Sequence, residues 1–139
     1  MPDKIHLEVE LARNSVAPGH ARRVLRNLCA DHVEHDLLVD AELLVSELVT
    51  NALRHGRGDI SLCARVDEER LRVEVIDGGS GFTNDVRGSD FGHTSGWGLD
   101  IVDVVSSRWG VREGATPVWF ELARPGRGSR SARPAAAAT

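Results

Sequence analysis

Between residues 37 and 75 the apolar side chains follow two different spacings, and this order most limits what the chain can fold into. In the first stretch they recur every three or four residues, which at about 100° per residue places them on one broad arc of a helix. In the second stretch they alternate with polar residues, as in a strand with one buried face. The order predicts a sheet with helices packed on it. The residues of the helical arc are Leu37, Ala41, Leu44, Val45, Leu48, Val49 and Ala52.

The same two spacings predict the remaining elements. Pro18 suits a first helical turn, and Gly56 and Gly58 suit a helix end. Glycine-poor alternating segments joined by the polar turn 67–70 predict an antiparallel hairpin. The predicted strands are 5–11, 60–66, 71–76, 109–112 and 118–122, and the predicted helices are 21–33, 37–54 and 99–107. We therefore expect an α+β fold, a two-layer α/β sandwich with a mostly antiparallel sheet and helices on one face.

Length and charge predict one folded domain with a basic tail. The chain has 139 residues, and its last segment, 124–139, holds four arginines, no acid and little to bury, so we expect residues 1–123 to fold and 124–139 to be a disordered basic tail. Without those four arginines the chain has 13 basic and 21 acidic residues, a net charge of about −8.

An acidic domain does not bind along a phosphate backbone, which argues against nucleic acid as the main partner. No apolar run approaches the ~20 residues of a membrane span and no secretory signal follows Met1, so we expect a cytoplasmic protein.

The cysteines, a pair of histidines and the tryptophans are each interpreted as structural rather than functional residues. Cys29 and Cys63 form no Cys-x-x-Cys pair, and each is expected to be a small buried residue. His32-x-x-His35 lies among acidic residues where two helices meet, and we interpret it as a solvated turn rather than a metal site. Three tryptophans are expected to pack in the core or in a loop that covers a ligand, namely Trp97, Trp109 and Trp119.

The basic residues limit how the chain can hold a phosphate. Of 17 basic residues, all but Lys4 are arginine, and Lys4 lies outside any glycine-rich sequence. A Gly-Lys-Ser/Thr phosphate loop and a Val-Ala-Ile-Lys kinase motif are therefore absent. Any nucleotide phosphates must be held by backbone amides, arginine and a metal ion.

Glu47 and Asn51 lie four residues apart on the predicted helix 37–54, so their side chains point the same way from adjacent turns. Both flank the apolar arc at the rim of the core. An amide oxygen there can ligate Mg²⁺, and a carboxylate can accept a proton from a nucleophile. The alternative is an ordinary hydrogen bond on the helix surface. Arg54 lies near the same rim and can pair with phosphate, whereas His55 equally fits a surface position at the helix end.

Glycines surround two other candidate positions. Asp77 ends a predicted strand and is followed by Gly79 and Gly81, which allows a backbone to approach a planar ligand, although Asp-Gly is also a common turn. Gly96 and Gly98 open the predicted helix at Leu99, where free amides favour an anion, or where the glycines simply form a hinge. Residues 78–98, which include these four glycines, hold seven of the 14 glycines of the chain. Loops of this length are usually functional.

The order of these motifs resembles the GHKL ATPase superfamily, whose members share the Bergerat ATP-binding fold. The sequence SELVTNALRHG, from Ser46 to Gly56, looks like its N box. Asp77-x-Gly79-x-Gly81 and Gly96-x-Gly98-Leu99 look like its two glycine boxes, and Thr116 looks like its late threonine. The compact size and the acid at position 47 most resemble the anti-sigma factor serine kinases of the RsbW and SpoIIAB type. The resemblance spans roughly residues 5–122.

The resemblance implies a role for each matched residue. Asp77 would accept a hydrogen bond from the adenine amino group, with Gly79 shaping the pocket and Thr116 assisting. Asn51 would ligate Mg²⁺ that bridges the ATP phosphates, and Glu47 would be the general base. Further phosphate contacts are implied for Arg54 and for the backbone amides of Gly96, Gly98 and Leu99, and residues 81–95 would be the ATP lid. Trp97 is bulkier than the residue common at its position in the family.

The resemblance leaves two functions open. In the first, the chain sequesters a sigma factor and phosphorylates a serine of a small anti-anti-sigma (STAS-type) protein, using ATP and Mg²⁺. In the second, it is an ATP-binding module that binds a protein partner with little turnover. A histidine kinase would need a dimerising hairpin with a phospho-accepting histidine, and only about 35 residues precede the N-box helix. Related anti-sigma kinases are dimers, so a homodimer is a further expectation, with Ile5–Leu11 a plausible sheet edge.

Overall fold

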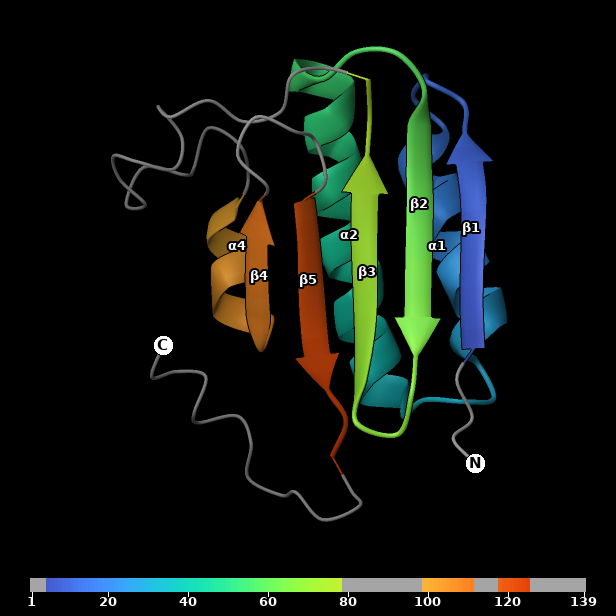
Figure 1. Ribbon diagram of the computed structural model, residues 1–139, viewed down its shortest axis with the longest axis vertical. Coiled ribbons are helices and arrows are strands. Elements are labelled where there is room, and N and C mark those ends of the chain that lie inside the picture. The colour runs from blue at the N-terminus through green and yellow to red at the C-terminus, as the bar shows by residue number, and fades with distance from the viewer. Residues whose placement is uncertain (1–4, 79–98, 112–117, 126–139) are drawn as a thin grey trace.

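Five antiparallel strands form one sheet in the part of the chain that this computed structural model describes, residues 5–78, 99–111 and 118–125. Their order is β1-β2-β3-β5-β4, so β5 lies between β3 and the edge strand β4 (Figure 1). Every neighbouring pair is antiparallel, as the alternating segments predicted. The bounds are β1 Ile5–Leu11, β2 Ile60–Val66, β3 Arg70–Ile76, β4 Arg108–Val111 and β5 Val118–Ala123.

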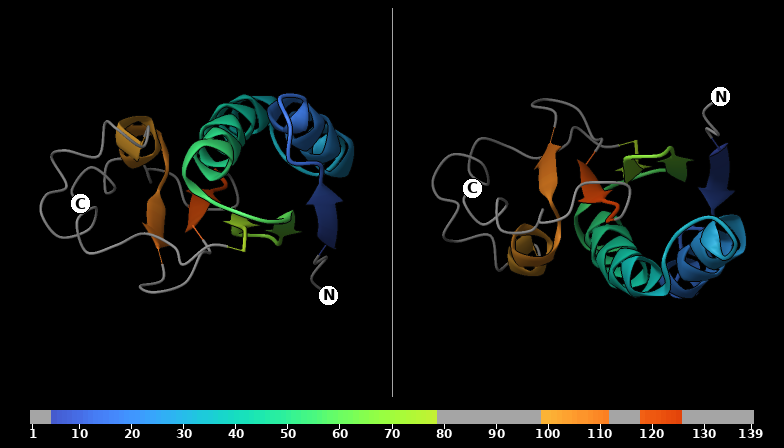
Figure 2. Two further views of the ribbon diagram at one scale, coloured as in Figure 1. Left: turned by 90° about the horizontal axis from the view of Figure 1, so that it is seen from above. Right: turned by 90° about the horizontal axis from the view of Figure 1, so that it is seen from below.

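The described helices all lie on one face of this sheet, as the two end-on views show (Figure 2). They are α1 Ala17–Cys29, α2 His35–His55 and α4 Leu99–Val105. The predicted two-layer α+β sandwich is therefore confirmed. In the part of the chain that the structure describes, none of the helices combines the length and the apolar character that crossing a bilayer requires.

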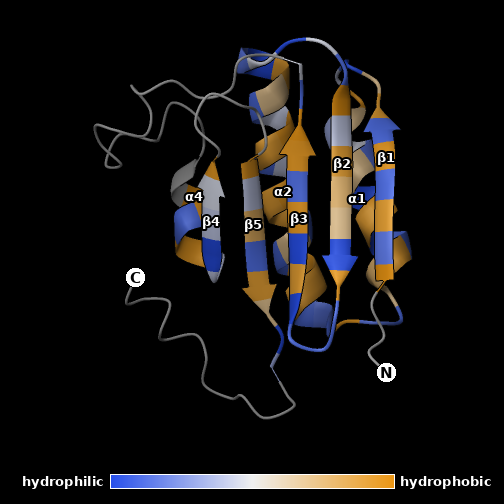
Figure 3. Ribbon diagram, viewed as in Figure 1, coloured by the Kyte–Doolittle hydropathy of each residue, from blue (hydrophilic) through white to orange (hydrophobic). Residues whose placement is uncertain are grey.

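The core lies between α2 and the sheet, and it is built from the predicted apolar positions. All seven residues of the helical arc of α2 are buried, together with Leu38. In β2 the residues at alternate positions are buried, from Ile60 to Val66, and in β3 the buried residues begin at Leu71. Figure 3 shows this alternation of hydrophobic and hydrophilic residues along the strands. Phe120 of β5 is the largest fully buried side chain of the described core.

The helix limits differ from the predicted ones by a few residues. Helix α1 begins at Ala17, with proline in its first turn, and ends at Cys29 rather than Val33. A turn follows, in which the amides of His32 and Val33 both donate to the carbonyl of Cys29, at 2.8 and 3.0 Å. His32 is exposed in this turn, and His35 is exposed as the first residue of α2.

Arg124 was predicted to begin the tail, but it is anchored to the folded domain. Its amide donates to the carbonyl of Glu69 at 2.9 Å, and its Nη1 donates to the carbonyl of Asp67 at 2.8 Å. Both acceptors belong to the turn between β2 and β3, so the end of β5 is tied to that hairpin. Of the remaining tail, residues 126–139 lie outside the described residues.

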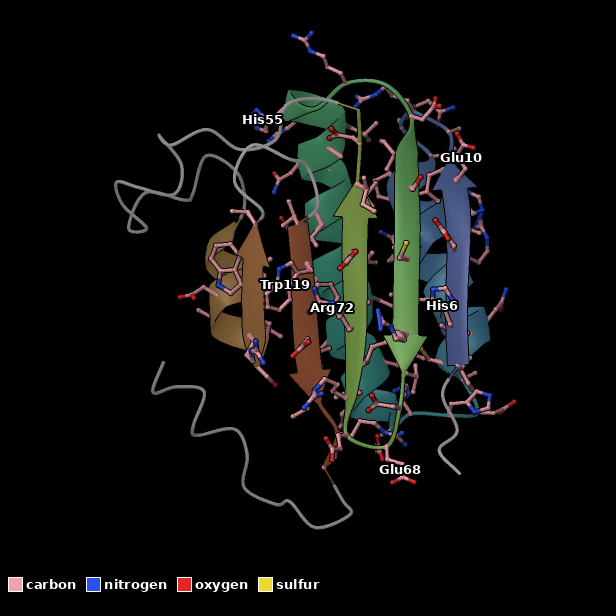
Figure 4. All side chains as sticks on the ribbon, viewed as in Figure 1. His6, Glu10, His55, Glu68, Arg72 and Trp119 are labelled. Atoms are coloured by element: carbon pink, nitrogen blue, oxygen red, sulfur yellow. The ribbon has the colours of Figure 1, made fainter. Side chains whose placement is uncertain are left out.

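Trp119, expected in the core or in a loop that covers a ligand, and Cys63, expected to be buried, lie instead on the sheet face that the helices leave uncovered. Trp119 is half-buried there, with the guanidinium of Arg72 stacked 4.2 Å from the ring centroid (Figure 4). Cys63 is half-buried on the same face, opposite Glu74. Both predictions failed because an alternating pattern shows which residues share a face, but an aromatic ring or a thiol is compatible with either face. Cys29 is buried and Trp109 packs against the core, as predicted.

Candidate functional site

The C-terminal half of α2 carries Glu47 and Asn51 on adjacent turns, as their spacing predicted. Glu47 is half-buried, and Asn51 is almost fully buried, with 6% of its surface exposed. Helical geometry explains the difference, because Asn51 lies nearer to the apolar arc that faces the sheet. The helix thus presents a carboxylate and an amide at the edge of the core.

The side chain of Asn51 has a buried polar atom that is unsatisfied within the described residues. Its Nδ2 atom is buried and has no hydrogen-bond partner among the described residues. Leaving a buried amide without a partner costs about 1–3 kcal/mol, so native proteins rarely keep one without a reason. Because the nitrogen and oxygen of an amide can exchange places by a flip of the side chain, this position can offer either a donor or an acceptor to a ligand.

Asp77 directly follows β3 and lies against the end of α2. A Cβ atom added at Gly56, the residue that ends α2, would overlap the carboxylate of Asp77, so only glycine allows this approach. The amide of Gly78 donates to the carbonyl of Arg57 at 2.7 Å. The end of the strand and the end of the helix lie at the same end of the molecule (Figure 1). The sequence pattern predicted that Gly56 ends the helix and the N-box match, but not that it lies against Asp77.

The turn after α2 is held by one arginine that sequence analysis missed. The guanidinium of Arg13 donates to the carbonyls of Ala52 at 2.8 Å, Leu53 at 3.2 Å and Gly58 at 2.8 Å. Arg13 comes 39 to 45 residues before its partners. Local sequence patterns do not reveal contacts over such a separation, so these hydrogen bonds could not be predicted from the sequence.

Arg54 and His55 occupy the last turn of α2, and both are exposed. His55 projects from the end of the helix (Figure 4). Cationic side chains are favourable at this end, where the helix dipole is negative. The position of Arg54 is compatible with the predicted phosphate contact but also with this simpler role.

The described residues include only part of the predicted site. Gly79, Gly81, Gly96, Gly98 and Thr116 lie outside the described residues, and so do the predicted lid 81–95 and Trp97. Leu99 begins α4, as the position of the second glycine pair predicted. The structure therefore brings Asp77 to the C-terminal end of α2, the helix that carries Glu47 and Asn51.

Comparison with known proteins identifies the family. A family model described as the histidine kinase-like ATPase domain matches residues 11–120, which is most of the chain. The chain belongs to this family. The match includes α2, β3 and α4, and hence Glu47, Asn51 and Asp77.

Individual relatives of this histidine kinase-like ATPase domain carry more specific names. The anti-sigma F factor of Clostridium acetobutylicum is 41% identical over 49 residues, which is 32% of this chain and 34% of that protein. The serine-protein kinase RsbW of Staphylococcus epidermidis is 29% identical over 86 residues, 50% of this chain and 54% of the kinase. The chain thus spans between a third and about half the length of these relatives.

A solved structure shares the fold. The crystal structure of the RsbU and RsbW domains of a Mycobacterium tuberculosis protein superposes with a TM-score of 0.63 and 25% sequence identity. The match covers 88% of this chain and 33% of that one. The resemblance to the anti-sigma kinase type is therefore confirmed at the level of family and fold.

As a member of an ATPase domain family, the chain has a site for ATP, and the described residues fit that ligand. The buried amide of Asn51 lacks a partner that a ligand would supply, and the glycine at position 56 leaves the carboxylate of Asp77 room beside the helix end. Among the described residues no group of three or more His, Cys, Asp or Glu side chains forms a metal site. The side-chain oxygen of Asn51 is of the kind that Mg²⁺ binds together with phosphate oxygens.

Proposed function

We propose that this chain is an ATP-dependent serine kinase that also binds a sigma factor. The observation that carries the proposal is the pairing on α2 of a half-buried carboxylate, Glu47, with a buried amide, Asn51, whose nitrogen has no partner among the described residues. The names of the relatives, an anti-sigma factor and a serine-protein kinase, support the same function.

In this proposal each site residue has a role in ATP binding or in phosphate transfer. Asp77 accepts a hydrogen bond from the amino group of adenine, and Asn51 provides an amide oxygen to Mg²⁺ at the phosphates. Arg54 and the backbone amides of Gly96, Gly98 and Leu99 contact the phosphates, while Gly79, Gly81 and Thr116 shape the adenine end. When bound, Mg²⁺ neutralises phosphate charge. Glu47, one turn from Asn51, removes the proton from the serine hydroxyl that attacks the terminal phosphate.

The partners follow from the same reasoning. A sigma factor is the protein that an anti-sigma factor binds, and the serine to be phosphorylated would belong to a small anti-anti-sigma protein of the STAS type. Phosphorylation adds close to two negative charges at neutral pH, which is enough to break a contact with an acidic domain such as this one. A homodimer in the cytoplasm completes the proposal.

The test is phosphate transfer by the purified protein. With Mg-ATP and small STAS-type proteins from the same organism as candidate substrates, the wild type should phosphorylate a serine of one of them, and Glu47→Ala should lower the rate by about 10²–10⁴-fold because a general base is lost. Calorimetry should show nearly unchanged ATP affinity for this variant, because Glu47 acts on the hydroxyl and not on the nucleotide.

A matched control tests whether the loss of rate is specific to Glu47. Glu42→Ala removes another half-buried glutamate of α2, one that pairs with Arg26 of α1 at 2.8 Å, and should leave the transfer rate unchanged. If the wild type binds ATP but transfers no phosphate to any such partner, the protein is a regulatory module in which ATP only shapes the binding surface. Equal rates for Glu47→Ala and wild type would show that Glu47 is not the base.

A further inference from the structure

Arg13 joins three backbone carbonyls that are far from it in sequence. It lies just after β1, and its three nitrogen atoms donate to Ala52, Leu53 and Gly58 at distances of 2.8 to 3.2 Å. Ala52 and Leu53 belong to the last turn of α2, and the carbonyl of Ala52 also accepts a hydrogen bond from the amide of Gly56 at 2.9 Å. Gly58 belongs to the turn that leads to β2. One side chain therefore ties the helix end to the turn that follows it.

A guanidinium suits this position better than other side chains. It is planar and presents its N–H donors in a fixed fork, so it can bind several carbonyls with little loss of conformational freedom. It is also cationic, which is favourable at the negative end of the helix dipole. The side chain is half-buried, so these hydrogen bonds are partly protected from water.

The turn that Arg13 holds is also the surface against which Asp77 lies. Gly56 contacts the carboxylate of Asp77, and the carbonyl of Arg57 accepts a hydrogen bond from the amide of Gly78 at 2.7 Å. Gly58 has a φ of +70°, a conformation that glycine adopts readily and other residues rarely do. Residues 56–58 are thus fixed on one side by Arg13 and contact residues 77–78 on the other.

We infer that Arg13 is a positioning residue for adenine recognition. It never touches the nucleotide, but it fixes residues 56–58, and these residues fix the carboxylate of Asp77 in the direction from which it binds the purine amino group. The inference rests on the proposed role of Asp77. It goes beyond that role because it predicts that purine selectivity depends on an arginine on the far side of the turn.

A purely structural role predicts a different outcome. If Arg13 only stabilised the fold, its loss would lower the free energy of unfolding and leave the preference among bound purines unchanged. If it positions Asp77, its loss must act selectively on the contact that Asp77 makes. Inosine triphosphate provides the comparison, because its purine carries a carbonyl where adenine carries the amino group.

The experiment is a double-mutant cycle read by calorimetry. Dissociation constants for Mg-ATP and Mg-ITP are measured for the wild type, Arg13→Met, Asp77→Asn and the double variant, with urea unfolding of each protein alongside. We expect Arg13→Met to lower the ATP-over-ITP preference by about threefold to thirtyfold, which lies within the range of coupling between residues of one network. In the Asp77→Asn background the same change should have no further effect on that preference.

Two further variants serve as a control and as a replacement for a variant that does not fold. Arg26→Met removes an arginine of α1 that pairs with Glu42 on α2, away from the helix end, and should leave the preference at the wild-type value. If Arg13→Met does not fold, Arg13→Lys replaces it in the experiment. Lysine keeps the charge but lacks the planar fork, so Arg13→Lys should still lower the ATP-over-ITP preference.

The outcomes separate the inference from the proposed function. An unchanged ATP-over-ITP preference in a folded Arg13 variant, or an equal loss in the wild-type and Asp77→Asn backgrounds, overturns the role of Arg13 while leaving the ATP site intact. A wild-type protein that binds ATP and ITP equally overturns the role of Asp77 and the inference with it. A wild type that binds neither nucleotide overturns the proposed function itself.

Discussion

The two cysteines show how strongly the surroundings of a single residue decide its chemistry. Cys29 ends α1 and is fully buried, and burial raises the pKa of its thiol from 9.0 to about 11. Cys63 lies on the open face of the sheet, where burial raises the pKa of its thiol first, and the nearby carboxylates of Glu8 and Glu74 raise it further. Both thiols are thus protonated and weakly nucleophilic near neutral pH.

The raised pKa of Cys29 predicts a loss of stability at high pH. The unfolded thiol ionises near pH 9 and the folded one only near pH 11, so its contribution to stability is complete below pH 9 and declines as the pH rises to about 11. Urea unfolding measured between pH 8 and pH 11 should show this decline, and Cys29→Ala should show a shallower one. The chain has no tyrosine to titrate in this range, which keeps the comparison simple. Parallel curves for the two proteins would contradict the prediction.

At the scale of elements, Glu121 connects the strands at one end of the sheet. It is buried on the open face, and its carboxylate lies 2.8 Å from Arg72 of β3 and 3.5 Å from Arg108 of β4. These strands flank β5 on both sides, so one carboxylate ties three strands together. Trp119 lies beside this group, with its ring packed on Gly110 of β4, where a Cβ would stand 2.9 Å from the indole.

Removing the charge of Glu121 should loosen these strands. Glu121→Gln leaves Arg72 and Arg108 without their shared anion, and we expect the free energy of unfolding to fall by about 1–3 kcal/mol. Urea unfolding followed by tryptophan fluorescence measures the change. Glu69→Gln is the matched control, because its pair with Arg70 is exposed and should contribute less than about 1 kcal/mol. A similar effect of both substitutions would mean that burial adds nothing to the Glu121 cluster.

At the scale of the whole molecule, the sequence predicted the elements better than their arrangement. Periodicity predicted β1 at its observed limits and the buried side of α2, because both depend on neighbouring residues. The insertion of β5 between β3 and β4 depends on pairing between distant segments, which no local pattern reveals.

The candidate site was likewise predictable only in part. The spacing of Glu47 and Asn51 predicted their shared side of α2, whereas the contact of Asp77 with Gly56 required the fold.

Ligand binding should stabilise the whole domain if the site is as proposed. At an ATP concentration about 100 times the dissociation constant, the free energy of unfolding should rise by about 2.7 kcal/mol, because the nucleotide binds only the folded chain. Asp77→Asn loses a hydrogen bond to a charged group, about 1.5–3 kcal/mol of affinity, so the same ATP concentration should stabilise it by about 1.3 kcal/mol or less. Urea unfolding with and without Mg-ATP measures both values. Asp31→Asn, in the exposed turn between α1 and α2, should gain as much as the wild type. An equal gain in Asp77→Asn would show that adenine is recognised elsewhere.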